Sequence, residues 1–311
     1  MLASLPGPLI AALVIVMVSV STIAHTTTLF VFALLRLLIP VPAFTRFISK
    51  LLIKIAESWI GVNSTLIEWF SAPRWQVEGL DGLSHGGWYL VLSNHQSWVD
   101  ILVLQRVFNR RIPFLKFFLK SQLIWVPFLG LAWWALDFPF MRRYSKETLE
   151  KRPELAGTDI EATRRACEKF ATVPVSVMNF VEGTRFTPEK HARQQSPFTH
   201  LLRPKAGGVA FVLETMGELL QAIVDVSIVY PKGRPTMGDL VSGRVRDVRV
   251  IIKRREIPAE MVGGSYENDP AFRERFQTWI NDLWLEKDAL LTVELQQLSD
   301  PLTQHSPRLD Q

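Results

Sequence analysis

The sequence contains a single cysteine, Cys167, among 311 residues. One cysteine excludes an intrachain disulfide framework and any multi-cysteine metal site. The chain also has no P-loop, no Gly-x-Gly-x-x-Gly dinucleotide motif and no Gly-x-Ser-x-Gly elbow between a predicted strand and a predicted helix. These absences argue against nucleotide-dependent enzymes and against hydrolases of the common elbow type.

Charge is missing from the start of the chain: no Lys, Arg, Asp or Glu precedes Arg36, and residues 9–24 are almost wholly apolar. About 20 such residues span a bilayer, and residues 9–35 would extend roughly 40 Å as one helix. The sequence therefore predicts one spanning or deeply embedded helix. A cleaved signal peptide is the alternative, but no basic residue precedes the apolar run and the run is too long.

The segment after Pro42 has apolar residues at helical spacing with basic residues between them. The apolar positions are Phe44, Phe47, Ile48, Leu51, Leu52, Ile55 and Trp59, and the basic ones are Arg46, Lys50 and Lys54. This pattern is typical of a helix in a membrane interface, with core packing against the catalytic domain as the alternative. Because the cations follow the apolar run, the positive-inside rule predicts a cytoplasmic catalytic part on the inner cell membrane, or on the endoplasmic reticulum in a eukaryote.

The most informative stretch is residues 94–100, NHQSWVD, directly after the apolar run 88–93. A uniform helix would rotate residues five apart by roughly 140°. His95 can therefore meet Asp100 only if His95 lies in a strand-to-helix turn and Asp100 in the first helical turn, with Ser97 as the N-cap. A histidine held by a carboxylate can take a proton from a hydroxyl near pH 7. The alternative is a Ser97–Asp100 capping pair beside an ordinary turn histidine.

A second polar turn, residues 180–185 with the sequence FVEGTR, follows the apolar run 173–179. Gly183 lets the backbone approach a ligand closely, Arg185 offers a planar fork that suits phosphate oxygens, and Thr184 adds a hydroxyl. These residues predict a phosphate-binding turn, and a solvated strand-end turn is the alternative. A base after one strand and a phosphate site after another indicate transfer onto a hydroxyl of a phosphorylated alcohol.

With these two motifs the chain resembles the glycerolipid acyltransferases that esterify lysophosphatidic acid and related lysophospholipids. NHQSWVD fits that family's Asn-His-four residues-Asp motif, FVEGTR fits its Phe-Pro-Glu-Gly-Thr-Arg motif, and residues 140–143 look like its second block, which closes on Arg143. Val181 and Asp225 stand where the third and fourth blocks carry proline. These departures make the chain look more like the branch with lysocardiolipin and lysophosphatidylinositol acyltransferases, and the bacterial proteins similar to them. The resemblance covers roughly residues 40–260.

The resemblance implies transfer of a fatty acyl group from an acyl thioester to the free hydroxyl of a lysophospholipid, with 1-acyl-glycerol-3-phosphate as the leading acceptor. His95, oriented by Asp100, is the implied general base. The implied substrate-binding residues are Arg143, Glu182, Gly183, Thr184 and Arg185. Acyl-coenzyme A or acyl carrier protein would be the co-substrate, and no metal or redox cofactor is expected. Backbone amides at the helix start after His95 are candidates to stabilise the oxyanion.

The rest of the chain alternates between strands and helices. The predicted strands are 75–78, 89–93, 136–142, 173–181, 223–229 and 245–252, and the predicted helices are 98–108, 159–171, 207–220 and 270–298. This order indicates an α/β fold, and the resemblance implies an acyltransferase-like mixed sheet flanked by helices. The expected division is 1–70 as membrane-anchoring helices, 71–298 as the acyltransferase domain and 299–311 as a flexible tail.

Two further segments are open to interpretation. Residues 112–130 are apolar around Lys116 and Lys120, which fits a re-entrant membrane segment, a simple core, or the acyl channel that the resemblance implies. The walls of that channel would be Trp125, Phe128, Trp133 and Trp134. The charged segment 187–205 follows the phosphate turn and is expected to cover it.

Two other classes of protein stay open. A membrane-bound serine hydrolase would use a nucleophile such as Ser97, and a non-catalytic lipid-binding protein would not need both His95 and Asp100. Lysophosphatidylinositol, lysophosphatidylglycerol and lysocardiolipin are alternative acceptors. The net charge of +5 is explained by an anionic membrane and phosphorylated substrates, so a nucleic-acid partner is not expected. Acyl length and oligomeric state do not follow from the sequence.

Overall fold

The computed structural model describes residues 6–141, 170 and 173–299. Its centre is a six-stranded sheet with the order β1-β8-β7-β2-β6-β3. The strands are β1 (Arg74–Glu78), β2 (Tyr89–Ser93), β3 (Leu115–Phe117), β6 (Ser176–Phe180), β7 (Ala222–Val229) and β8 (Asp247–Arg255). All neighbouring strands are parallel except β7 and β8, which are antiparallel. The expected mixed α/β sheet is therefore confirmed.

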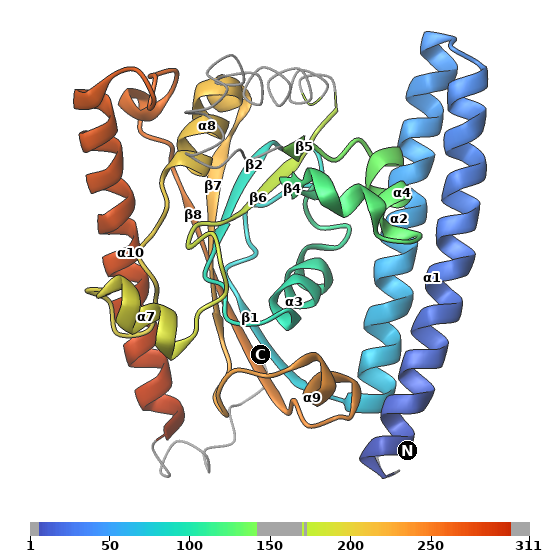
Figure 1. Cartoon of the computed structure of the whole chain (residues 1–311), viewed down its shortest axis with the longest axis horizontal. Helices are drawn as coiled ribbons and strands as arrows, with labels where there is room; N and C mark the ends of the chain where they lie inside the picture. The colour runs from blue at the N-terminus through green and yellow to red at the C-terminus, as the bar shows by residue number, and fades with distance from the viewer. Residues whose placement is uncertain (1–5, 142–169, 171–172, 300–311) are drawn as a thin grey trace.

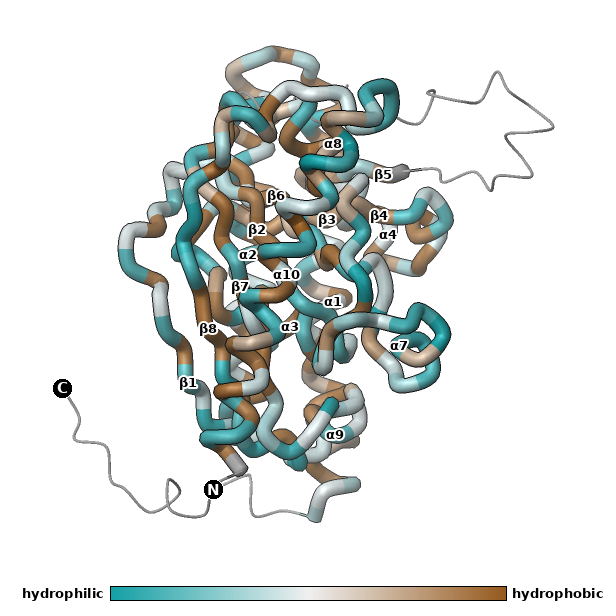
Figure 2. The backbone as a smooth tube through the Cα atoms, turned by 90° about the vertical axis from the view of Figure 1, so that its left-hand side faces the viewer, coloured by the Kyte–Doolittle hydropathy of each residue, from teal (hydrophilic) through white to brown (hydrophobic). Residues whose placement is uncertain are grey.

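Helices cover both faces of this sheet (Figure 1). One face packs against α8 (Gly207–Met216) and α10 (Pro270–Ser299), and the other packs against α3 (Val99–Phe108). Every residue of β2 and β7 is buried, which explains why these strands read as continuous apolar runs and not as alternating ones. Figure 2 shows the hydrophobic colouring along the central strands and the hydrophilic colouring on the outlying α7 (Pro188–Gln194).

The first two helices form an antiparallel pair along one side of the molecule, opposite α10 (Figure 1). They are α1 (Gly7–Leu38) and α2 (Pro42–Ser71), and Pro42 begins α2. By length and composition, α1 is apolar enough to cross a membrane, and little of its most apolar window is buried. Three polar pairs join the helices: His25 with Ser58, Trp59 with Thr22, and Arg36 with Ser49.

The basic amphipathic stretch lies within α2. Its apolar residues Ile48 and Leu52 are buried against α1 and α4 (Leu129–Ala135), whereas Lys50 and Lys54 are exposed. The packing alternative therefore holds for this apolar side of α2.

The remaining elements are short. They are β4 (Leu119–Lys120), η2 (Ser121–Trp125), β5 (Phe140–Met141), η5 (Gly217–Leu219), α9 (Met237–Val241) and η6 (Ala259–Met261). The predicted strand 136–142 is wrong in its first part, because α4 runs to Ala135 and Asp137 has a φ of 57°. Only Phe140 and Met141 form a strand there, and they pair with β4 outside the main sheet. The predicted helix 159–171 lies outside the described residues, apart from Phe170.

Candidate active site

The two sequence motifs meet because they follow neighbouring strands. β2 and β6 are parallel, with Ser93 opposite Phe180. The turn after β2 and the turn after β6 therefore leave the same edge of the sheet side by side. Phe186 in the second turn donates its backbone N–H to the His95 carbonyl at 2.7 Å, so the two turns are also joined directly.

His95 and Asp100 are in contact, as their spacing requires. His95 Nδ1 lies 2.9 Å from Asp100 Oδ2, and Asp100 is fully buried in the first turn of α3. The same oxygen accepts the backbone N–H groups of Gln96 at 2.6 Å and Ser97 at 2.8 Å, and Oδ1 accepts the Tyr230 hydroxyl at 2.6 Å. Burial, followed by the charge of Asp100, raises the pKa of Tyr230 well above its ordinary value. Tyr230 therefore stays a neutral donor to the carboxylate.

The imidazole of His95 is in contact through its ring face as well as through Nδ1. It stacks on the Phe180 ring with the centroids 3.8 Å apart and the planes 12° from parallel. Because Nδ1 faces the carboxylate, the Asp100 oxygen fixes the proton on Nδ1 and leaves Nε2 to accept one. His95 is 11% exposed, which suits a base that works beside an apolar wall.

The turn that carries His95 is fastened to β7. Asn94 exchanges two hydrogen bonds with the backbone of Ile228, at 3.0 and 2.9 Å, and Gln96 Nε2 donates to the Ile228 carbonyl at 2.9 Å. Sequence reasoning missed these anchors and Tyr230, since they depend on β7 lying beside β2.

Two expectations about this turn are wrong. Ser97 is not the residue before the helix, because α3 begins at Val99; its buried hydroxyl donates to the Pro235 carbonyl and accepts from Val99 N–H. The amides of Gln96 and Ser97 are directed to Asp100 and not to a substrate oxyanion. The Asp100 carboxylate thus accepts amides that precede the helix, while the Ser97 hydroxyl accepts the N–H of Val99, the first residue of α3.

The serine-hydrolase alternative finds no nucleophile in this part of the fold. Ser97 Oγ bonds to Pro235 and not to His95. Residues 82–86, GLSHG, have the letters of a Gly-x-Ser-x-Gly elbow. They lie in the connection between β1 and β2, where Ser84 N–H donates to the Tyr89 hydroxyl, and not between a strand and a helix.

Glu182 connects the two turns from the buried side of the site. Its carboxyl group is buried, and its oxygens accept the backbone N–H of His95 and of Leu202, each at 2.8 Å. Burial raises the pKa of Glu182 to about 8, an effect that outweighs the two amide hydrogen bonds. The structure therefore places Glu182 beneath the site, where it positions the His95 backbone.

The rest of the second turn presents polar groups outward. Gly183 has a φ of 67°, a conformation that side chains rarely adopt, and an added Cβ there would lie 2.9 Å from the Lys205 side chain. Lys190 Nζ donates to Thr184 Oγ1 at 2.7 Å and to the Arg185 carbonyl at 2.9 Å. Since Thr184 Oγ1 already accepts a bond, its hydroxyl proton is left to donate.

Aromatic rings support two arginines at the rim of the site. The Arg185 guanidinium lies 4.6 Å above the exposed Trp98 ring. Arg234, from the loop after β7, lies 4.9 Å above Phe186 and donates to the Phe186 carbonyl. Together with Lys190 these side chains make a cationic surface beside His95. Lys190 and Arg234 were missed in the sequence, although the charged segment 187–205 was expected to cover this turn.

The remaining expectations concern Arg143 and the four aromatic residues that would form the walls of an acyl channel. Arg143 lies outside the described residues. Trp125, Phe128 and Trp134 are exposed and so do not line a channel here, while Trp133 packs in the cluster between α1, α2 and α4.

Asp225, which replaces the proline expected in β7, has a structural use. It pairs with Arg255 of β8 and with the buried Lys287 of α10. Lys287 also donates to the Val226 carbonyl, and burial lowers its pKa despite the charge of Asp225. This buried pair fastens α10 to the centre of the sheet.

Fold and site together define an α/β protein with a carboxylate-oriented histidine beside a cationic turn. Residues 74–231, just over half of the chain, match the family model described as Acyltransferase. The chain belongs to the acyltransferase family.

Three curated relatives of this chain are all named as 1-acyl-sn-glycerol-3-phosphate acyltransferases. The chain is 24% identical over 255 residues to 1-acyl-sn-glycerol-3-phosphate acyltransferase delta of Homo sapiens, a match that covers 78% of this chain and 60% of the relative. It is 25% identical over 231 residues to the gamma enzyme of Mus musculus, covering 70% of this chain and 56% of that one. It is 26% identical over 245 residues to 1-acyl-sn-glycerol-3-phosphate acyltransferase 2 of Brassica oleracea, covering 73% and 57%. The chain therefore spans well under two thirds of the length of these relatives.

The fold matches a solved structure over almost its whole length. This is the crystal structure of the 1-acyl-sn-glycerophosphate (LPA) acyltransferase PlsC from Thermotoga maritima, with a TM-score of 0.54 and 16% sequence identity. The match covers 94% of this chain and 97% of the other. At this identity the likeness establishes the fold alone.

Proposed function

We propose that this protein transfers a fatty acyl group from an acyl thioester to the free hydroxyl of a lysophospholipid, with 1-acyl-glycerol-3-phosphate as the acceptor. The observation that carries the proposal is the 2.9 Å contact of His95 Nδ1 with Asp100 Oδ2 beside a cationic turn. Family membership and the names of the curated relatives support the same reaction.

In this reaction His95 Nε2 takes the proton of the acceptor hydroxyl, and the oxygen attacks the thioester carbonyl. The new C–O bond forms a tetrahedral oxyanion, which collapses as the C–S bond breaks. The leaving thiolate takes the proton back from the imidazolium, which the Asp100 carboxylate stabilises until then. No acyl-enzyme is formed. Acyl-coenzyme A or acyl carrier protein is the donor.

The cationic turn holds the acceptor phosphate so that the hydroxyl reaches His95. Arg185 offers the phosphate a planar pair of N–H donors, and the Thr184 hydroxyl offers a further hydrogen-bond donor. Lys190, whose ammonium donates to Thr184, adds a second positive charge. Several charges of one sign suit the terminal phosphate of lysophosphatidic acid, which carries more charge than a phosphodiester. Positioning of this kind can contribute several orders of magnitude to the rate.

We also propose that α1 lies in one leaflet of the membrane and does not span it. α1 packs along α2, and α2 in turn contacts α3 and α9 (Figure 1). A spanning α1 in this arrangement would carry α2, with exposed Lys50 and Lys54, into the hydrocarbon. Of the two arrangements expected from the sequence, a spanning helix and a deeply embedded one, we therefore propose the embedded one. Its basic neighbours favour the cytoplasmic face of the inner membrane.

The test is an acyl-transfer assay on the purified full-length protein with a panel of lysophospholipids and both donors, read by mass spectrometry. Phosphatidic acid should be the main product, and the His95→Ala variant prepared in parallel should make none. Preferred use of a diester acceptor such as lysophosphatidylglycerol would overturn the acceptor assignment. Absence of transfer to every acceptor would overturn the reaction itself.

A further inference from the structure

Four large apolar side chains project from η2 and α4 into solvent. Trp125 is 85% exposed, Phe128 53%, Leu131 49% and Trp134 42%. We call these four residues the apolar wedge. Contiguous exposed apolar side chains of this size mark an interaction surface, because burying them elsewhere in the fold would otherwise be favourable.

The backbone beneath the wedge is tightly folded. Gly130 N–H donates to the Val126 carbonyl at 2.8 Å, and a Cβ added to Gly130 would lie 2.0 Å from the Ile124 carbonyl oxygen. Phe128 has a φ of 62°, a backbone conformation that non-glycine residues rarely adopt. The fold therefore holds the Phe128 ring outward on a fixed support.

The inner side of α4 fastens the wedge to the α1–α2 pair. Ala132 and Ala135 pack in one cluster with Leu29 and Ala33 of α1. Arg36, near the end of α1, pairs with Asp137 at 2.8 Å. The wedge and the second half of α1 therefore move as one body.

The same half of α1 exposes a set of apolar side chains: Phe30, Val31, Leu34 and Leu35. Exposed Lys120 stands at the start of η2 and suits an anionic headgroup. Tryptophan is enriched where one end of a side chain is apolar and the other is wet, as at a membrane interface. We propose that the apolar wedge inserts into a phospholipid bilayer as a second membrane contact, beside α1 and separate from it.

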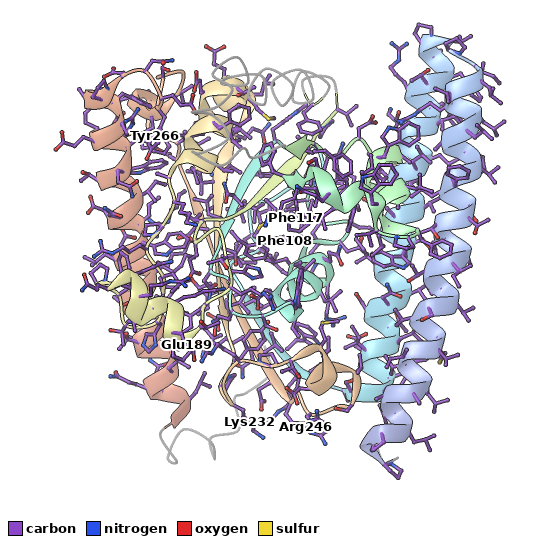
Figure 3. The ribbon with its side chains drawn as sticks, in the orientation of Figure 1. Phe108, Phe117, Glu189, Lys232, Arg246 and Tyr266 are labelled. Atoms are coloured by element: carbon purple, nitrogen blue, oxygen red, sulfur yellow. The ribbon has the colours of Figure 1, made fainter. Side chains whose placement is uncertain are left out.

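This contact has a consequence for the site. Phe138 lies three residues after the end of α4. A series of rings leads from it to the histidine: Phe138 to Phe117 at 6.5 Å, Phe117 to Phe180 at 6.3 Å, and Phe180 to His95 at 3.8 Å. Figure 3 places Phe117 in the middle of the molecule, between the sheet and the helix pair. A wedge held at the bilayer therefore fixes the depth at which His95 meets a lipid acceptor.

The test uses single-cysteine forms of the full chain made in a Cys167→Ser background. Trp125→Cys and Leu131→Cys report on the wedge, and Val16→Cys reports on the exposed side of α1. Leu285→Cys is the matched control, since Leu285 is apolar and 62% exposed but belongs to α10, which runs along the opposite side of the molecule from α1 (Figure 1). Each is labelled with an environment-sensitive fluorophore. The proteins are added to vesicles of phosphatidylethanolamine and phosphatidylglycerol, with and without doxyl-labelled lipid.

Both wedge labels should shift to the blue on vesicles and lose fluorescence to doxyl lipid, as the α1 label does, whereas the Leu285 label should do neither. The proposal is overturned if the α1 label is quenched and both wedge labels are not. A wedge signal that depends on protein concentration and not on lipid would overturn it in favour of a second copy of the chain. The inference rests on the proposed membrane attachment and not on acyl transfer. If no label is quenched, the attachment and the wedge fail together while the proposed reaction stands.

Discussion

The two turns that form the site are built in different ways. In the turn after β2, the polar side chains of Asn94, His95, Ser97 and Asp100 are all hydrogen-bonded within the protein. In the turn after β6, only Glu182 points inward, and the remaining polar groups face outward over Lys190. A proton-transfer group needs one fixed geometry, whereas an anion-binding surface needs charge that a ligand can reach. The difference is the one expected if the first turn carries out the proposed proton transfer and the second binds the proposed phosphate.

Asp100→Asn breaks the first turn most directly. The amide can still bond to His95, but it cannot stabilise the imidazolium, and its N–H₂ would face the Gln96 and Ser97 amides. We expect kcat to fall on the order of a thousandfold or more, with little change in the acceptor KM. Steady-state kinetics on folded protein measures this, and activity within tenfold of the wild type would mean that Asp100 is only a helix cap.

Arg185→Lys tests the binding turn. A point charge cannot reproduce a planar two-point grip on phosphate, nor the stacking on Trp98. We expect kcat/KM for the acceptor to fall by about ten to a hundredfold, mainly through KM, since one charge-assisted hydrogen bond is worth about 1.5–3 kcal/mol. A defect seen only with varied acyl donor would assign the turn to the other substrate.

Lys190→Met removes a charge behind the same turn at nearly constant length. The acceptor KM should rise by about tenfold with kcat little changed, because Thr184 and the Arg185 carbonyl lose their shared donor. Arg193→Gln is the matched control, because Arg193 lies on the same helix, is exposed and carries the same charge. Equal effects of the two substitutions would reduce the role of Lys190 to general electrostatics.

Glu182 connects the two turns, and we expect its replacement to change how the protein's stability depends on pH. Folded Glu182 keeps its proton up to about pH 8, whereas an unperturbed Glu ionises near 4.5. Between these values the folded state holds the extra proton, so this group's contribution to the free energy of unfolding declines as pH rises through the window. Glu182→Gln should be less stable at low pH but show a flatter pH dependence in thermal unfolding. An unchanged pH slope would show that Glu182 is ionised in the folded state.

Much of the first turn follows from local sequence, and little of the second does. The strand β2 and the meeting of His95 with Asp100 depend on residues within twelve positions of one another. Tyr230 and Arg234 reach the site only because β7 lies beside β2. The sequence left residues 112–130 open between a re-entrant membrane segment, a core and a channel lining for a related reason: an apolar run looks the same whether it is a strand, a core helix or an exposed surface.

The central claim is that His95 acts directly on the acceptor hydroxyl without an acyl-serine intermediate. The measurement is acyl transfer by the full-length wild type, His95→Ala and Ser97→Ala side by side, with intact-protein mass spectrometry after incubation with the acyl donor alone. We predict no acyl adduct on any of the three, loss of transfer in His95→Ala with membrane association intact, and transfer retained in Ser97→Ala. An acyl adduct that disappears in Ser97→Ala, or more than residual activity in His95→Ala, would contradict the account.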